Sequence, residues 1–268
     1  MRKILQSLAA VALCGSSLFA ETLTVDSLVT ISGEEVYKNG ATNSSTAVVK
    51  SGGELVIEDT GVLELLNEAG SSNSRLQLTG GNLVVDGKLK TNAILAQGGT
   101  NEITINSANS IGKSNGTLAE LMFIGGSLTV NLNASQDFFV WDTRASGLKL
   151  VFAENTSTLF DSIKYNSTDA TVVLQDFGST NSIAFNTTAY GTTQTYDTSL
   201  DGNKLTFSSE TAGKTFTLTF VDGNGNALDL ALSNSGNIAT LTAVPEPAEW
   251  AAIFGATALV LAYARRRR

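Results

Sequence analysis

The residues best suited to chemistry lie close together near the middle of the chain. Asp137, Asp142 and Arg144 flank a short aromatic run that includes Trp141. Carboxylates beside an aromatic ring can hold a sugar, and paired carboxylates can cleave a glycosidic bond. In a strand, however, alternate residues of the run would point into a core while the acids face solvent. We favour this simpler interpretation, so Asp137, Trp141 and Asp142 are weak candidates for glycan contact and no catalytic residue is predicted.

The residue types that the chain lacks exclude several chemistries. It contains no histidine, and its one cysteine, Cys14, lies close to the N-terminus. A body without thiols has no disulfide framework. It also lacks the thiolate and imidazole ligands of zinc, and it cannot assemble a Ser-His-Asp or Cys-His site. We therefore predict neither a cofactor nor enzymatic activity.

One loop has oxygen-bearing side chains at alternate positions, like the start of a calcium-binding loop. It is the segment 222–226, which reads Asp-Gly-Asn-Gly-Asn. An EF-hand-type loop needs glycine at its sixth position and glutamate at its twelfth. Here those positions hold Ala227 and Ser233, so we expect a turn instead of a metal site.

The N-terminus carries a signal for export. Residues 1–20 begin with the basic pair Arg2 and Lys3, continue with an apolar stretch and end in small residues up to Ala20. This is the pattern of a secretory signal peptide. We predict export through the secretion machinery and cleavage by signal peptidase after Ala20. Cys14 follows Leu13 instead of a small residue, so lipidation is not expected.

The C-terminus combines three features within residues 244–268. Residues 245–247 read Pro-Glu-Pro, residues 250–264 carry no charge, and four arginines end the chain. As a helix the apolar stretch spans about 22 Å, less than the roughly 30 Å of a bilayer core. Aromatic rings at the two ends of the stretch are suited to the membrane–water interfaces, and its small residues allow close packing against another helix. The arginines favour placing the C-terminal end of the helix in the cytoplasm. We predict an inner-membrane helix anchored through Trp250, Ala251, Gly255, Ala258 and Tyr263.

The order of these features resembles the PEP-CTERM sorting signal of Gram-negative bacteria. The resemblance implies recognition by an exosortase, a membrane transpeptidase-like enzyme that processes such tails near the Pro-Glu-Pro motif. It also implies an association with exopolysaccharide and biofilm. Carried over to this chain, it assigns a sorting motif, an anchor at 250–264 and a retention signal. The motif would be Pro245, Glu246 and Pro247, and the retention signal Arg265, Arg266, Arg267 and Arg268.

Between these signals, residues 21–243 show the alternation of apolar and polar residues that indicates strands. The best internal candidate for helical periodicity is the segment 117–124, which is short. Glycine pairs precede four strand-like segments, with start-to-start spacings of 28, 18 and 27 residues along the chain. The pairs are Gly52-Gly53, Gly80-Gly81, Gly98-Gly99 and Gly125-Gly126.

A glycine turn that feeds a short strand at such intervals is typical of a parallel β-helix, in which stacked coils share one core. The pattern resembles autotransporter passengers and other secreted β-solenoids. We predict an all-β fold with a right-handed parallel β-helix over 21–189. An antiparallel β-sandwich, in which the glycine pairs mark hairpins, is the alternative.

Residues 190–243 have a different sequence pattern. The segments at 201–203 and 222–225 contain Asp-Gly or Gly-Asn and lie between stretches of alternating apolar and polar residues. Such dipeptides in this context indicate β-hairpin turns. We predict antiparallel strands over 204–208, 215–221, 227–232 and 238–242. Such a set would cap the open end of the last coil.

The charge of the body restricts its partners. Residues 21–243 contain 23 acidic and 11 basic residues, a net charge near −12, and such a surface repels nucleic acid and anionic lipid. We predict an exported structural or adhesive protein, displayed on the cell envelope or released into the extracellular matrix. Its expected partners are the export and sorting enzymes, the inner membrane and polysaccharide. A carbohydrate-binding module or polysaccharide-active enzyme on the same scaffold is the alternative.

Overall fold

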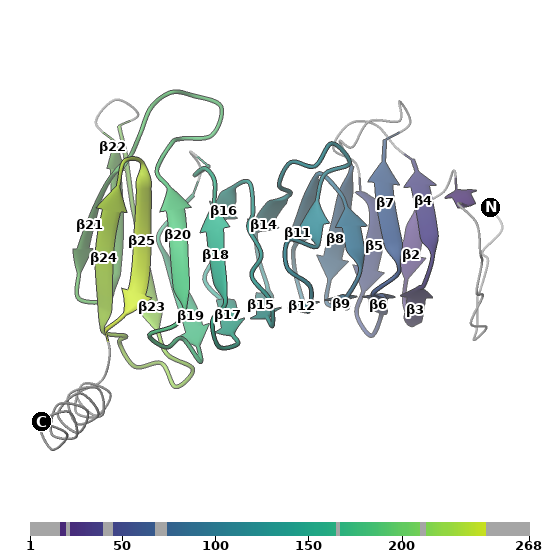
Figure 1. The fold of residues 1–268 in the computed structure, drawn as a ribbon, viewed down its shortest axis with the longest axis horizontal. Helices are drawn as coiled ribbons and strands as arrows, with labels where there is room; N and C mark the ends of the chain where they lie inside the picture. Colours follow the sequence, from purple (N-terminus) through teal and green to yellow (C-terminus); the bar gives the residue numbers. More distant parts are fainter. Residues whose placement is uncertain are drawn as a thin grey trace, which may run out of the picture.

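The computed structural model describes residues 17–19, 22–39, 45–67, 74–164, 167–209 and 213–244. Their regular structure is entirely β, in strands that stack along one long axis (Figure 1). Within these ranges there is no helix with the length and apolar character needed to cross a bilayer. The sorting motif, the anchor and the arginine tail lie outside the described residues, as does the predicted signal peptide except for Ser17–Phe19.

The chain winds through three faces in the same order on each coil. The first face is sheet B, whose strands are all parallel. It contains β2 (Leu23–Val25), β5 (Ser45–Lys50), β8 (Arg75–Thr79), β11 (Ala93–Ala96), β14 (Glu120–Phe123) and β16 (Trp141–Thr143).

The second face is sheet C. Its parallel part contains β3 (Leu28–Ile31), β6 (Glu54–Ile57), β9 (Asn82–Val85), β12 (Thr100–Ile105), β15 (Ser127–Leu132), β17 (Leu148–Phe152) and β19 (Ala170–Gln175). Three later strands extend it, namely β23 (Lys214–Val221), β22 (Lys204–Ser209) and β21 (Asp197–Asp201).

The third face is divided between two sheets. Sheet A contains β1 (Ser17–Phe19), β4 (Glu34–Lys38), β7 (Val62–Leu66), β10 (Lys88–Lys90) and β13 (Ile111–Gly112). Sheet D takes over this face in the later coils, with β18 (Ser157–Phe160), β20 (Ser182–Asn186), β25 (Ile238–Ala243) and β24 (Leu230–Ser235).

Apolar alternation holds the coils in register. In each strand of sheet C every second side chain points into the core, where it meets the equivalent side chain of the next coil. One such ladder runs through Val29, Leu55, Leu83, Ile103, Val130, Leu150 and Leu174. The strands β6, β9, β12 and β15 each follow one of the four glycine pairs, so the repeat seen in the sequence is one corner of four successive coils.

These pairings confirm the prediction of an all-β chain with mostly parallel sheets in a β-helix-like stack. The antiparallel sandwich is wrong, because the parallel ladders dominate all three faces. The helical periodicity at 117–124 was also misleading, since residues 120–123 form β14. Every residue of that strand is buried. Leu121 and Phe123 face the main core and Met122 a second apolar cluster, so the alternation that identifies a strand is absent.

The predicted antiparallel strands are present, but the third begins at Leu230 instead of residue 227, β21 was not predicted, and one connection differs. β21 and β22 form a hairpin around Gly202, and β22 pairs antiparallel with β23. β24 and β25 form a second hairpin. The segment at 222–229 does not join two neighbouring strands, because it crosses from sheet C to sheet D. One cluster of buried apolar residues extends from Leu23 in the first coil to Leu241 in β25, so coils and hairpins share a single core.

The first coil has two polar side chains on its third face, beside the apolar Val25 and Ile31 that it contributes to the core. Glu35 and Tyr37 occupy the positions that Leu63 and Leu65 fill in the next coil. The Tyr37 hydroxyl donates to the Glu35 carboxylate at 3.2 Å. Burial raises the pKa of the Glu35 carboxyl, and burial together with the neighbouring Glu35 charge raises the pKa of Tyr37. A polar pair at this position suits the end of a stack more than its interior.

A buried glutamine bridges the break between sheets A and D. Gln136 is fully buried, and its side-chain amide accepts from the Ile111 N–H and donates to the Ile111 carbonyl, both at 3.0 Å. The amide thereby replaces the backbone partner that another strand of the coil would supply. Phe138 then joins Phe160 of β18 through a parallel bridge.

We expect Gln136→Leu to lower the free energy of unfolding by about 2 kcal/mol, because two buried backbone groups lose their partner. Chemical denaturation of the purified protein measures this change. Gln175→Leu is the matched control, since the Gln175 amide donates to the exposed Asp176 carboxylate and lies beside Gly223 at the surface, and it holds no buried backbone group among the described residues. Equal losses in the two variants would show that the bridge contributes nothing.

Candidate binding site

The aromatic residue proposed for sugar stacking lies inside the core. Trp141 is 1% exposed. Its ring packs edge-on against Phe160 and Phe185, with ring centroids 4.7 and 5.3 Å away. Neither face of the indole is open to a ligand, so Trp141 supplies no stacking platform. The favoured interpretation is right that this ring belongs to the core but wrong about the pattern, because Phe138 and Trp141 enter the core three residues apart and Asp142, expected to face solvent, is fully buried.

The two candidate carboxylates are not brought together. Asp142 lies on β16 in sheet B, fully buried, and Arg144 donates to it through two nitrogens, each at 2.8 Å. Asp137 lies on the face that continues into sheet D, where its carboxylate accepts from the Leu159 N–H at 2.9 Å. Each acid therefore has a structural partner on a different face, and the arrangement offers no carboxylate pair for glycoside chemistry.

The loop at Asp222 is a self-contained turn. The Asp222 carboxylate accepts from the backbone N–H groups of Asn224 and Asn226, each at 2.8 Å, and from the Asn226 side chain at 3.0 Å. These bonds, chiefly those from Asn226, lower the pKa of the Asp222 carboxyl. The carboxylate oxygens thus organise the turn, as the sequence pattern indicated.

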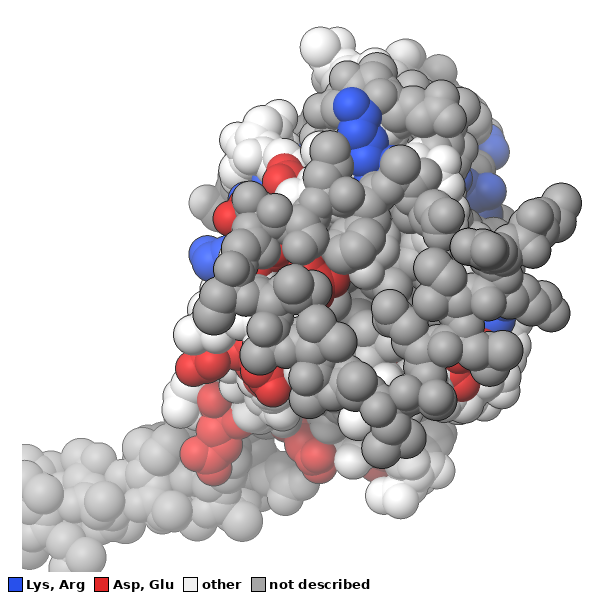
Figure 2. Space-filling view, turned by 90° about the vertical axis from the view of Figure 1, so that its right-hand side faces the viewer, with Lys and Arg blue, Asp and Glu red and all other residues white. Residues whose placement is uncertain are grey.

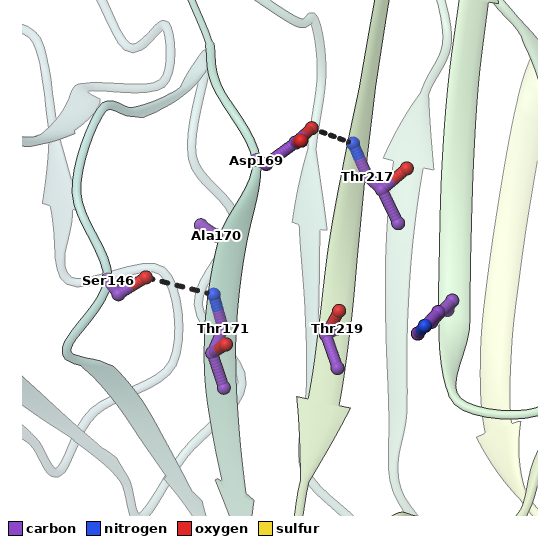
Figure 3. A pocket seen from close by; sticks show the side chains of 7 residues that line it. Ser146, Asp169, Ala170, Thr171, Thr217 and Thr219 are labelled. Atoms are coloured by element: carbon purple, nitrogen blue, oxygen red, sulfur yellow. Dashed lines mark hydrogen bonds between the residues drawn. The ribbon is translucent and has the colours of Figure 1, made fainter.

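An open polar groove lies on sheet C where the coils meet the hairpins (Figure 3). It has a volume of about 410 Å³ and is lined by Ser146, Asp169, Ala170, Thr171, Lys204, Thr217 and Thr219. The groove arises because neighbouring strands start at staggered positions. β23 extends beyond the first residue of β19, and β19 beyond that of β17.

Two side chains replace the backbone partners that the stagger removes. The Ser146 hydroxyl accepts from the Thr171 N–H at 3.3 Å, and the Asp169 carboxylate accepts from the Thr217 N–H at 2.7 Å (Figure 3). Among the described residues, the second carboxylate oxygen of Asp169 and the ammonium of Lys204 have no hydrogen-bond partner, and they lie beside the hydroxyls of Thr171 and Thr219. This set can hold a small hydroxylated ligand by hydrogen bonds, and it contains no aromatic ring for stacking.

A second group of polar and aromatic side chains gathers outside sheet B. Lys113 lies 4.5 Å from the ring centroid of Phe139, and Lys164 lies 4.1 Å from that of Tyr190. The two rings meet edge-on at 5.6 Å, and Lys164 is 3.9 Å from the Glu120 carboxylate. Burial, and to a lesser degree Glu120, raises the pKa of Tyr190. These charges and rings satisfy one another, so the group stabilises the contacts between coils.

Neither surface could be found from the sequence. The residues of the groove come from positions 146 to 219, and those of the second group from four successive coils, so only the register of the coils brings them together. No protein-family model matches this chain, and no curated protein matches it significantly.

Proposed function

We propose that the protein is a non-enzymatic structural or adhesive component of the cell envelope or extracellular matrix. Its body would be a right-handed parallel β-helix with a cap of antiparallel hairpins. It would be exported through its N-terminal signal peptide and held in the inner membrane by the helix at 250–264 until an exosortase-like enzyme processes the tail. The observation that supports this best is the stack of coils around one core, whose described exterior has few exposed large apolar side chains. Exopolysaccharide is the expected neighbour of such a surface.

The mass of the C-terminal peptide from the native host tests the sorting step. In the extracellular fraction we expect a terminus at or near residues 245–247, without the four arginines. An intact Arg268 confined to the membrane fraction would instead mean that the helix is a permanent anchor, and the sorting proposal would fail.

A single substitution in the motif sharpens this test. We expect Glu246→Ala to reduce the processed fraction at least about tenfold, which corresponds to roughly 1.4 kcal/mol of lost recognition. Glu249→Ala is the matched control, because it removes the same side chain three positions beyond Glu246. Immunoblots of the two fractions measure the result, and equal processing of both variants would exclude a role for the motif.

The groove on sheet C favours a second candidate function, that of a carbohydrate-binding module. Its hydroxyls, the Asp169 carboxylate and the Lys204 ammonium suit a hydroxylated ligand. If this is right, the protein binds a polysaccharide in a binding panel, and Lys204→Ala weakens that binding about tenfold, the loss of a charge-assisted hydrogen bond. Lys149→Ala, on the same face, should bind like the wild type. Absence of binding across the panel would exclude this function.

A further inference from the structure

The two ends of the stack present strand edges that run in the same direction. At the C-terminal end, β23 pairs parallel with β19, and two antiparallel steps follow through β22 to β21. β21 therefore has the direction of the coil strands. On the third face, β20 pairs parallel with β18, and two antiparallel steps lead through β25 to β24. β24 has the coil direction as well.

The edges also lie on matching faces. Among the described strands, β21 ends sheet C and β24 ends sheet D, while β3 ends sheet C at the opposite end of the stack (Figure 1). The corresponding strand of the third face there is β4. At the C-terminal end Thr198 of β21 bonds to Asn234 of β24 at 3.3 Å, so these edges belong to adjacent faces. At the N-terminal end β3 and β4 are consecutive in the chain and also lie on adjacent faces.

The edge of β4 already accepts a parallel strand. β1 pairs with it in register, Ser17 beside Glu35 and Phe19 beside Tyr37. β1 lies within the predicted signal peptide, so cleavage after Ala20 would remove it and leave this edge open. An open parallel edge is a template for another strand.

We propose that the processed protein assembles head to tail with further copies of itself, β21 of one copy pairing in parallel with β3 of the next and β24 with β4. This rests on the proposed function, because export must first remove β1. Since the two surfaces are different, the contact does not close on itself, and it propagates as a filament along the axis of the stack. At the N-terminal end the contact would combine these strand edges with the polar pair Glu35 and Tyr37 and with the apolar Val25 and Ile31 of the first coil.

Charge makes this assembly conditional. Asp197 and Asp201 are exposed on β21, and Asp26 and Glu34 are exposed near β3 and β4. Figure 2 looks onto the N-terminal end, where acidic side chains gather on one side. Like charges at the two ends oppose contact at low salt, and screening removes this barrier. Filaments should therefore grow with protein concentration and with ionic strength.

Sedimentation velocity on the processed protein from the extracellular fraction tests the proposal at low and high salt. We expect concentration-dependent oligomers at high salt. Leu28→Glu should weaken association at least about tenfold, because Leu28 is 63% exposed on the outer face of β3 and the new charge would lie beside the exposed acids of β21. Thr129→Glu makes the same change in the middle of sheet C and should associate like the wild type.

Thiol cross-linking separates a head-to-tail contact from a two-fold one. Since the only cysteine, Cys14, lies in the predicted signal peptide, single cysteines can be placed on β4 and β24. A short cross-linker should join Glu34→Cys to Ala231→Cys in a mixture, but should not join two Glu34→Cys copies.

Three results would overturn the proposal. They are a monomer at every concentration and salt, cross-linking between two Glu34→Cys copies, and a mature N-terminus that retains residues 17–19. The C-terminal peptide mass from the same samples reports separately on processing, so assembly can fail while the proposed function stands.

Discussion

Replacing Trp141 by alanine should lower the free energy of unfolding by about 3–5 kcal/mol, the range for truncating a large buried aromatic residue. The indole is almost fully buried, and it joins the rings of Phe160 and Phe185, which belong to the two coils that follow. Its loss leaves a cavity where three coils meet, and close-packed neighbours fill such a cavity only in part.

Urea unfolding followed by far-UV circular dichroism measures this loss without relying on the fluorescence that the substitution removes. Leu28→Ala is the control, because most of the Leu28 side chain is exposed and its truncation should cost less than about 0.5 kcal/mol. A Trp141→Ala protein as stable as the control would mean that the ring does not lie in the core.

Adding one methyl group at Gly81 should cost about 3 kcal/mol, the upper end of the usual range for overpacking. A Cβ there would lie 2.5 Å from the carbonyl oxygen of Lys50 and 2.5 Å from a methyl of Val49. The oxygen belongs to the backbone of the preceding coil, so the clash can be relieved only by moving two coils apart. Gly81→Ala should therefore lower the unfolding midpoint in urea.

Gly125→Ala is the matched control for Gly81, because Gly125 also belongs to a glycine pair of the repeat. A Cβ at Gly125 meets no atom within 4 Å, so the variant should keep the wild-type midpoint. If both variants lost the same stability, the cause would be backbone entropy common to the pairs and not the close approach of coils.

The sequence was informative where one face of a strand is buried and the other meets water. Alternation of apolar residues located the strands of sheet C, and the glycine pairs located the corner that precedes four of them. The hairpin around Gly202 followed from its turn residues. These signals are local, because each depends on residues close together in the chain.

Prediction failed where long-range contacts decide the environment. β14 is buried on both faces, so its four residues gave no alternation. The segment after Asp222 has hairpin residues, but the chain there changes sheets, which only the position of β20 beside β25 determines. Asp137 and Asp142 are close in the sequence, yet a corner of the coil sends them to different faces. The groove at Ser146 depends on the stagger of three strands, and no pattern in the sequence of any one strand indicates that stagger.

The position of the last strand has a mechanical consequence. β25 leads directly to the C-terminal tail, and it lies between β20 and β24 in sheet D. The Val244 N–H extends its pairing by donating to the Asp229 carbonyl at 3.0 Å. A force applied through the tail along β25 would shear two ladders of hydrogen bonds at once instead of peeling one strand from an edge. Tension from a membrane or matrix attachment would thus pass into the whole stack before the attachment point unravels.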